Sequence, residues 1–247
     1  MPDLLSRYRA GHREAVWHEL RQLGAQVRMP DRIDEARAVC DEMARRARHN
    51  VDLVIARLVA DGHHFHTNDD DRRMVPAHVP PTAEVEAHIS WLEDHVGPVP
   101  LALASWMRHV GDVWLVGTHP EWADIADADP LVIEAEGSRS PEALIREYFA
   151  EEYEIWREAY ADDPASAGVF RLPLAPDALH KANVSGGPPA GMRLPDACAD
   201  GLFGSEGAEP FVDYLNRVFR HGGFPGATGA VAAWRVRRRL AEGLLPL

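Results

Sequence analysis

The residues best suited to chemistry lie together in positions 180–187, whose sequence is HKANVSGG. This segment combines an imidazole, an ammonium, an amide, a hydroxyl and two glycines. Such a loop can hold a carboxylate or a phosphate through Lys181 and through backbone N–H groups. We therefore predict that His180, Lys181, Asn183 and Ser185 contact a partner or a ligand. Because such polar side chains commonly bond their own loop, a purely structural role stays open for all four.

Lys181 is the only lysine of the chain, since one lysine and 25 arginines make up the 26 basic residues. A lysine retained against so strong a preference for arginine can mark a place where a compact ammonium fits and a planar guanidinium does not. Chance retention is the alternative, and the composition does not separate the two.

Three histidines and a run of aspartates form the second polar segment, HHFHTNDDD at positions 63–71. On a strand, His64 and His66 share one face, which is a workable pair of imidazole ligands. No third ligand is fixed by spacing, and Asp69–Asp71 are more typical of a solvated loop. We therefore expect no cofactor and no metal, and we keep His64 and His66 as weak candidates for a metal site.

Several catalytic motifs of known enzyme classes are matched only in part by the sequence, because a required residue is missing. His18 and Glu19 start a zinc-protease HExxH motif, but Gln22 stands where the second histidine is required. Ser185 follows Asn183 rather than the spaced glycine of a nucleophile elbow. Glycine-rich phosphate-binding motifs are absent from the sequence. We therefore predict no catalytic residue and a protein that is not an enzyme.

The net charge of −13 argues against nucleic acid as a partner and favours a basic protein partner or simple solubility. The basic cluster at 235–239, which follows Trp234, is expected to complement a helix dipole, with nucleic-acid binding as a poor second. No run of about 18 apolar residues is present, so no membrane span is predicted. The first residues lack a signal-peptide pattern and only two cysteines occur, so we expect a cytoplasmic protein.

Apolar periodicity and the positions of Gly and Pro predict a mixed sequence of helices and strands. A helix is expected over 3–24, broken at Gly11. A second long helix is expected to open at Pro30 and Asp31, with its apolar stripe over 33–58, so that the N-terminus forms a helical hairpin. The cluster Pro76, Pro80 and Pro81 marks a boundary. Beyond it we expect helices at 82–96, 100–110, 140–160, 209–221 and 228–243, and strands at 112–117, 130–135, 169–174 and 192–194.

Several stretches together resemble the SUKH superfamily, the Smi/Knr-like fold of bacterial immunity proteins. The residues that carry the resemblance are LEDHVGPVPLALASWMRHVG, VWLVGTHPEW and DPLVIE within 82–135, and FRLPLAPDALHKANVSGG and FVDYLNRVFRHGGFPG further on. The resemblance covers about 80–226. It implies an α+β fold, a twisted antiparallel sheet with helices packed on one side, and an actinobacterial-type member. The chain then divides into an N-terminal helical extension, 1–75, and a SUKH-like α+β domain, 80–247.

The resemblance also implies a function, because SUKH proteins act mostly by binding and notably by neutralising partner toxins. The first hypothesis is accordingly a non-catalytic protein-binding module. We expect Trp122, in the turn HPEW, to be partly exposed and to anchor a partner. The alternative is a small-molecule or anion-binding protein, or an enzyme, that uses the loop of His180 and Lys181. A homo-oligomer formed through the helices of 3–60 is also open.

Overall fold

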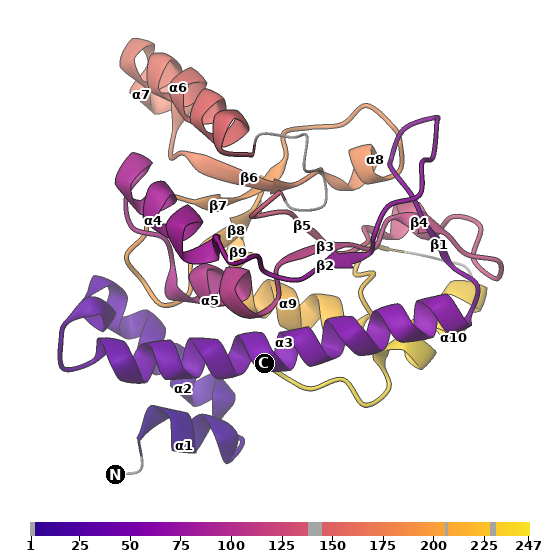
Figure 1. The fold of residues 1–247 in the computed structure, drawn as a ribbon, viewed down its shortest axis with the longest axis horizontal. Helices are drawn as coiled ribbons and strands as arrows, with labels where there is room; N and C mark the ends of the chain where they lie inside the picture. Colours follow the sequence, from indigo (N-terminus) through magenta and orange to yellow (C-terminus); the bar gives the residue numbers. More distant parts are fainter. Residues whose placement is uncertain (1–2, 138–144, 206, 228–230) are drawn as a thin grey trace.

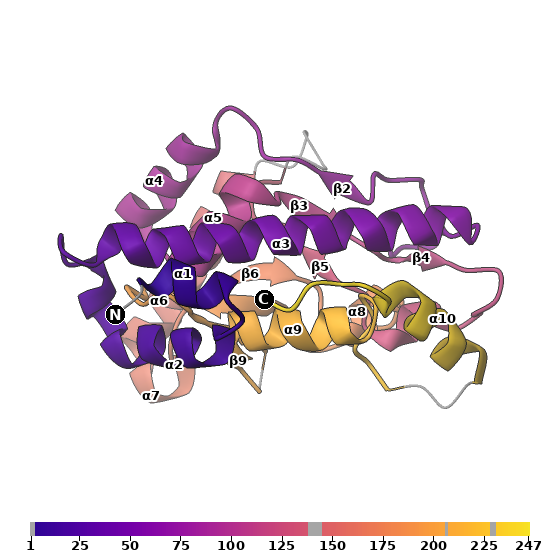
Figure 2. The ribbon, with the colours of Figure 1, turned by 90° about the horizontal axis from the view of Figure 1, so that it is seen from below.

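A single long helix, α3 (Ile33–Ala60), runs along the length of the molecule (Figure 2). The computed structural model describes residues 3–137, 145–205, 207–227 and 231–247. The buried side chains of α3 recur every three or four residues, from Ala36 through Met43 and Val51 to Leu58. This spacing places them on one face of the helix, so the long helix predicted from the sequence is confirmed.

The N-terminal helices precede α3 and pack against one end of it. They are α1 (Leu4–Arg9), α2 (Arg13–Leu23) and the 3-10 turn η1 (Gly24–Arg28). Gly11 separates α1 from α2 with a φ of 102°, so the predicted break is confirmed. Arg21 of α2 forms an ion pair with the buried Asp200 at 2.7 Å. This pair joins the N-terminal segment to the C-terminal half of the chain.

The strands are short and pair antiparallel throughout, in three small sheets with the orders β1-β4, β2-β3-β5 and β6-β7-β8-β9. A backbone hydrogen bond from Glu134 to Leu174, 2.8 Å long, connects the end of β5 to β6. The strands are β1 (His64–Phe65), β2 (His78–Val79), β3 (Asp112–Trp114), β4 (Gly117–Thr118), β5 (Val132–Ile133), β6 (Arg171–Ala175), β7 (Ala190–Arg193), β8 (Leu202–Gly204) and β9 (Glu209–Pro210). The predicted α+β class is confirmed.

The remaining helices lie on both sides of the strands. In Figure 1, α3, α5 and α9 lie below them, whereas α6 and α7 lie above β6. These helices are α4 (Val85–His95), α5 (Leu101–His109), η2 (Ile125–Ala128), α6 (Ile145–Asp162), α7 (Pro164–Ala167), α8 (Ala178–Lys181), α9 (Phe211–Arg220) and α10 (Val231–Ala241). The predicted starts of two helices, 140–144 and 228–230, lie outside the described residues.

One hydrophobic core extends from the N-terminal helices to the C-terminal helix. It contains Tyr8 and Trp17 from the N-terminal helices, Trp106 from α5 and Val236 from α10. The long helix α3 packs along α5, which belongs to the region of the SUKH resemblance. Segments 1–75 and 80–247 therefore share one core. None of the described helices is both long and apolar enough to cross a lipid bilayer.

Candidate functional site

The segment 177–187, here called the α8 loop, is held in shape by the carboxylate of Asp177. Its Oδ1 accepts hydrogen bonds from the backbone N–H groups of Leu179 and His180 at 2.7 and 3.2 Å, which caps α8. Its Oδ2 lies 2.5 Å from the imidazole Nδ1 of His180. Burial raises the pKa of Asp177, but the hydrogen bonds to His180 and Leu179 outweigh it and lower this pKa below its ordinary value. The carboxylate therefore fixes the orientation of the half-exposed His180 ring.

Lys181 points inward from the α8 loop. Its side chain is 3% exposed, and its Nζ lies 2.6 Å from Oδ1 of Asp129. Asp129 follows η2 and has a left-handed backbone conformation, with φ at 54°. The ion pair thus fastens the α8 loop to η2. This position favours the structural role for Lys181 over contact with a partner, and a compact ammonium suits a single carboxylate oxygen of the partly buried Asp129.

Asn183 and His180 connect the α8 loop to the aspartate-rich loop 67–73. The amide of Asn183 donates to Oδ1 of Asp70 at 2.8 Å, and the amide of Asn68 donates to the backbone carbonyl of His180 at 2.8 Å. Asn183 has a φ of 60°, a conformation that asparagine tolerates better than most residues. Two polar segments more than 100 residues apart in the sequence thus lie side by side. Ser185 lies nearby and is exposed.

The histidine pair expected at 64 and 66 does not form a common site. Strand β1 ends at Phe65, and His64 is exposed whereas His66 is buried. The Nδ1 of His66 lies 2.7 Å from the carbonyl oxygen of Thr67. No group of three or more metal-ligating side chains comes together within the described ranges. The two rings therefore lie in different environments, His64 in solvent and His66 buried.

The neighbouring His63 is enclosed. Its ring contacts Phe65 edge to face, with centroids 4.6 Å apart, and lies 6.0 Å from the ring of His119. Gly117 leaves no room beside it, since a Cβ at that position would collide with the imidazole. Burial, with His119 and His66 adding to it, lowers the pKa of His63 to about 3. The ring is neutral at physiological pH.

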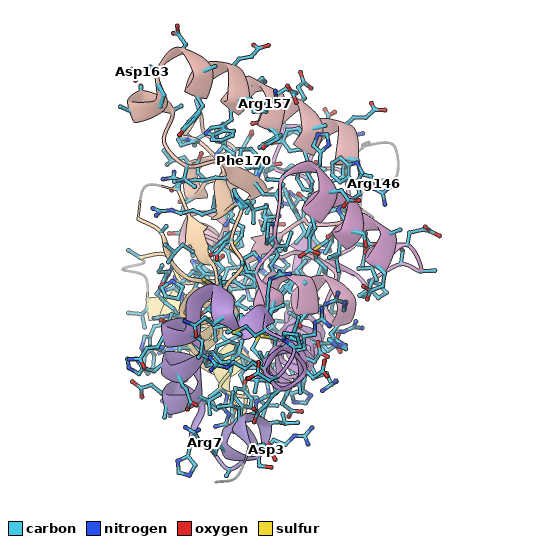
Figure 3. The ribbon with its side chains drawn as sticks, turned by 90° about the vertical axis from the view of Figure 1, so that its left-hand side faces the viewer. Asp3, Arg7, Arg146, Arg157, Asp163 and Phe170 are labelled. Carbon is cyan, nitrogen blue, oxygen red and sulfur yellow. The ribbon has the colours of Figure 1, made fainter. Side chains whose placement is uncertain are left out.

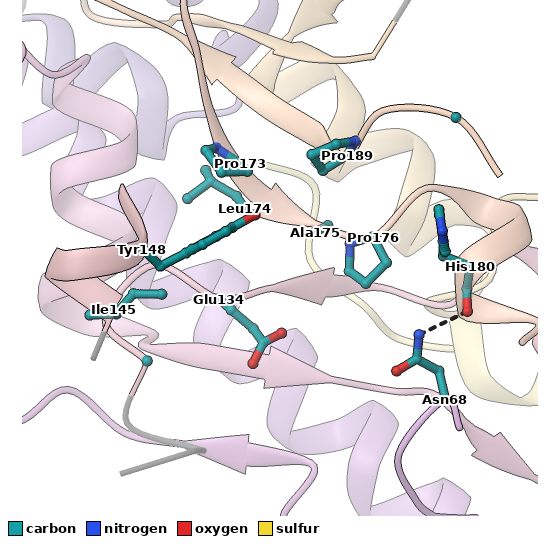
Figure 4. A pocket seen from close by; sticks show the side chains of 12 residues that line it. Asn68, Glu134, Ile145, Tyr148, Pro173, Leu174, Ala175, Pro176, His180 and Pro189 are labelled. Atoms are coloured by element: carbon teal, nitrogen blue, oxygen red, sulfur yellow. Dashed lines mark hydrogen bonds between the residues drawn. The ribbon is translucent and has the colours of Figure 1, made fainter. Parts of the chain in front are cut away.

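An open pocket of about 480 Å³ lies between α6 and α8, and we call it the α6–α8 pocket (Figure 4). Pro173, Pro176 and Pro189 line it together with Tyr148 from α6, and His180 and Asn68 lie at its other side. The mostly apolar wall and few polar groups are typical of binding pockets. Of these residues, His180 was predicted from the sequence, whereas the prolines and Tyr148 were not. The sequence features that could have indicated this pocket are the proline of the strand LPL and the pair Pro188–Pro189.

Helix α6 borders the pocket and carries most of its side chains in solvent. Of its described residues only Phe149 is buried. Figure 3 shows the helix at the top of the molecule, with Arg157 and Asp163 far from the body and Phe170 beneath. Tyr148 and Ile155 are exposed and seven residues apart, so they lie on one face. Six carboxylates and two guanidiniums between Ile145 and Asp162 give the helix a net charge of −4.

The expected exposure of Trp122 is wrong. Its side chain is 1% exposed, because the turn that holds it packs against the C-terminal segment. The Phe224 ring lies 5.6 Å from the indole, and the guanidinium of Arg237 lies 5.1 Å over it. Trp122 is therefore a core residue and cannot anchor a partner in this conformation.

The site has a fixed imidazole but no assembled nucleophile. No serine or cysteine side chain forms a hydrogen bond with His180 within the described residues. Burial, together with Asp196, raises the pKa of the Cys198 thiol to about 11, so a thiolate at neutral pH is not supported there. The arrangement is suited to binding.

Comparisons of the chain with protein-family models, curated proteins and solved structures find no match.

Proposed function

We propose that this protein is a non-catalytic protein-binding module that binds a basic partner through α6, the α6–α8 pocket and the α8 loop. The observation that carries the proposal is an apolar pocket bordered by exposed apolar side chains and by an acidic helix. Tyr148 is 42% exposed, and Leu179 and Val184 of the α8 loop are each more than half exposed. Exposed apolar groups gathered around a pocket are typical of interaction surfaces.

Charge supports a basic partner. Glu151 and Glu152 lie between Tyr148 and Ile155 on the exposed side of α6. Neither carboxylate forms an ion pair within the described part of the chain. Basic side chains of a partner can therefore pair with them while an apolar side chain enters the pocket. Such complementarity raises the association rate, and added salt lowers it.

The resemblance to the SUKH superfamily supports the same proposal, in the form of an immunity-type protein that occludes a toxin or a similar partner. The interlocked α8 loop fits this role, because a surface that is ordered before binding loses less entropy on association. We place the protein in the cytoplasm, which is consistent with two cysteines that are both free.

Affinity capture from the native host, with quantitative mass spectrometry, tests the role of charge. Glu151→Lys replaces a negative by a positive charge on the proposed surface, a change of +2, and Glu14→Lys makes the same change on the exposed N-terminus of α2. We expect wild type and Glu14→Lys to capture the same basic protein in equal amounts at low salt. Glu151→Lys should not capture this protein. Equal capture by all three proteins contradicts the proposal.

The pocket also favours a second candidate, a small molecule bound beside His180. The imidazole is held by Asp177 at 2.5 Å, and one side of the pocket is polar. A thermal-shift screen of carboxylates and phosphorylated metabolites tests it, because a ligand that binds the native state raises Tm. A shift that His180→Ala removes favours this candidate over protein binding. If none of the compounds raises Tm, the small-molecule candidate is eliminated.

A further inference from the structure

A second recessed surface, which we call the C-terminal hollow, lies between the end of α9 and the outer face of α10. Its volume is about 1060 Å³, and Arg220, Trp234, Arg235 and Arg238 are among the residues that line it. In Figure 1, α10 and α6 lie at opposite ends of the molecule. The hollow is thus separate from the surface proposed above, and no part of the proposed function depends on it.

The packing of α10 determines which side chains face the hollow. Ala233, Val236 and Leu240 are buried, and this spacing of three and four residues turns Trp234 and Arg238 outward. The turn after α9 holds Arg220 close to them. Gly222 in that turn has a φ of 63°, and a Cβ there would collide with Leu240. The two sides of the hollow are therefore held at a fixed separation.

Two of the five arginines that line the hollow are already engaged by the protein. Arg239 pairs with Asp61 at 2.7 Å and with Glu121 at 3.7 Å. Arg237 donates to the carbonyl of Gly226 and lies over the ring of Trp122. These two hold α10 in place and are not available to a ligand.

The other three arginines that line the hollow are exposed. Within the described residues, Arg220, Arg235 and Arg238 form no ion pair. One carboxylate, that of Glu242, lies among the residues that line the hollow. The result is a local surplus of positive charge on a chain whose net charge is −13. Guanidinium groups without partners at one concave surface are suited to a phosphate, which they bind in bidentate fashion.

Trp234 adds an aromatic surface to this group of charges. The indole is 60% exposed, and the guanidinium of Arg238 lies 5.5 Å from its ring centre. Because the side chain is this exposed, indole surface remains for a planar ring to stack on. Aromatic side chains beside arginines bind nucleobases by stacking while the cations bind the phosphates.

We infer that the C-terminal hollow binds a nucleoside polyphosphate. Arg220, Arg235 and Arg238 contact the phosphates, and Trp234 stacks on the base. The hollow has the size of a small-molecule site. A long nucleic acid is disfavoured, because the chain as a whole carries a net charge of −13. The ligand class is therefore a mononucleotide with two or three phosphates.

Isothermal titration calorimetry of the full chain with ATP, tripolyphosphate and adenosine tests this inference. We expect ATP to bind with one site per chain and with an affinity that falls as salt rises. Arg235→Ala/Arg238→Ala should weaken ATP binding at least tenfold, since each charge-assisted hydrogen bond contributes strongly. Arg45→Ala/Arg157→Ala removes the same charge from exposed positions outside the hollow and should leave the affinity within about twofold.

A second variant separates stacking from charge. Trp234→Ala should weaken ATP binding roughly tenfold and leave tripolyphosphate binding unchanged. The inference is overturned if ATP does not bind at about 1 mM, or if both double variants weaken it equally. A single-stranded oligonucleotide that binds when ATP does not also overturns it.

Discussion

His63 should make the protein lose stability in mild acid, and the structure sets the size of the effect. The ring is buried beside Gly117 and Phe65, and its pKa is about 3, against 6.5 for an ordinary histidine. Below pH 6.5 the unfolded chain therefore binds a proton at this position that the folded chain does not. Stability is fully present above pH 6.5 and falls as the pH falls toward 3. Between pH 8 and pH 5 the loss is about 2 kcal/mol.

Urea unfolding at pH 8 and pH 5 measures this loss when wild type is compared with His63→Phe. The comparison is needed because other groups also titrate. Burial raises the pKa of Asp200 to about 6, and this acts in the opposite direction, since the folded chain then binds the extra proton. The free energy of unfolding of wild type should fall by about 2 kcal/mol more than that of His63→Phe.

The substitution also alters the packing, but this changes the free energy of unfolding by the same amount at both pH values. It therefore cancels when only the change between pH 8 and pH 5 is compared. His64→Phe is the matched control, since His64 is the exposed neighbour, and it should keep the pH dependence of wild type. If His63→Phe and wild type lose the same free energy between the two pH values, the reasoning about His63 is refuted.

Two further predictions concern the α8 loop. Lys181→Ala should lower the free energy of unfolding by about 2 kcal/mol, because it leaves the Asp129 carboxylate, 25% exposed, without its cation; an unchanged urea midpoint would show that the pair is not structural. Gly186→Ala should lower Tm, because its Cβ would collide with the capping carboxylate of Asp177, at a cost of about 1 kcal/mol or more. Gly187→Ala meets nothing within 4 Å and is the control, so equal melting of the two variants would contradict the packing described.

The features that the sequence predicted correctly are those that neighbouring residues determine. The stripe of α3 and the break at Gly11 depend on residues within one or two turns of each other. The strand regions follow from short apolar runs between Gly and Pro, although most of these strands are shorter than predicted. Local chemistry also pointed to the α8 loop as the place where polar groups gather.

The features that could not be predicted depend on residues far apart in the chain. Lys181 pairs with an aspartate 52 residues away, and Asn183 with one 113 residues away. Trp122 lies in a turn, which predicts exposure, but Phe224 and Arg237 cover it. The α6–α8 pocket brings together residues as far apart in the sequence as Asn68, Tyr148 and Pro189. No local feature of a single sequence indicates which distant segments come into contact.

The central claim is that the surface around the α6–α8 pocket binds a protein, and a pair of matched substitutions tests it most directly. Leu179→Asn replaces an exposed apolar side chain of the α8 loop by an uncharged polar one, and Val59→Asn makes the same kind of change at a similarly exposed position on α3. The measurement is the amount of each host protein captured by wild type and by the two variants, after both variants are shown to melt like wild type. We predict that one specific protein is captured equally by wild type and by Val59→Asn, and that Leu179→Asn does not capture it. Capture that is equal for all three, or no specific capture by wild type, would contradict the account.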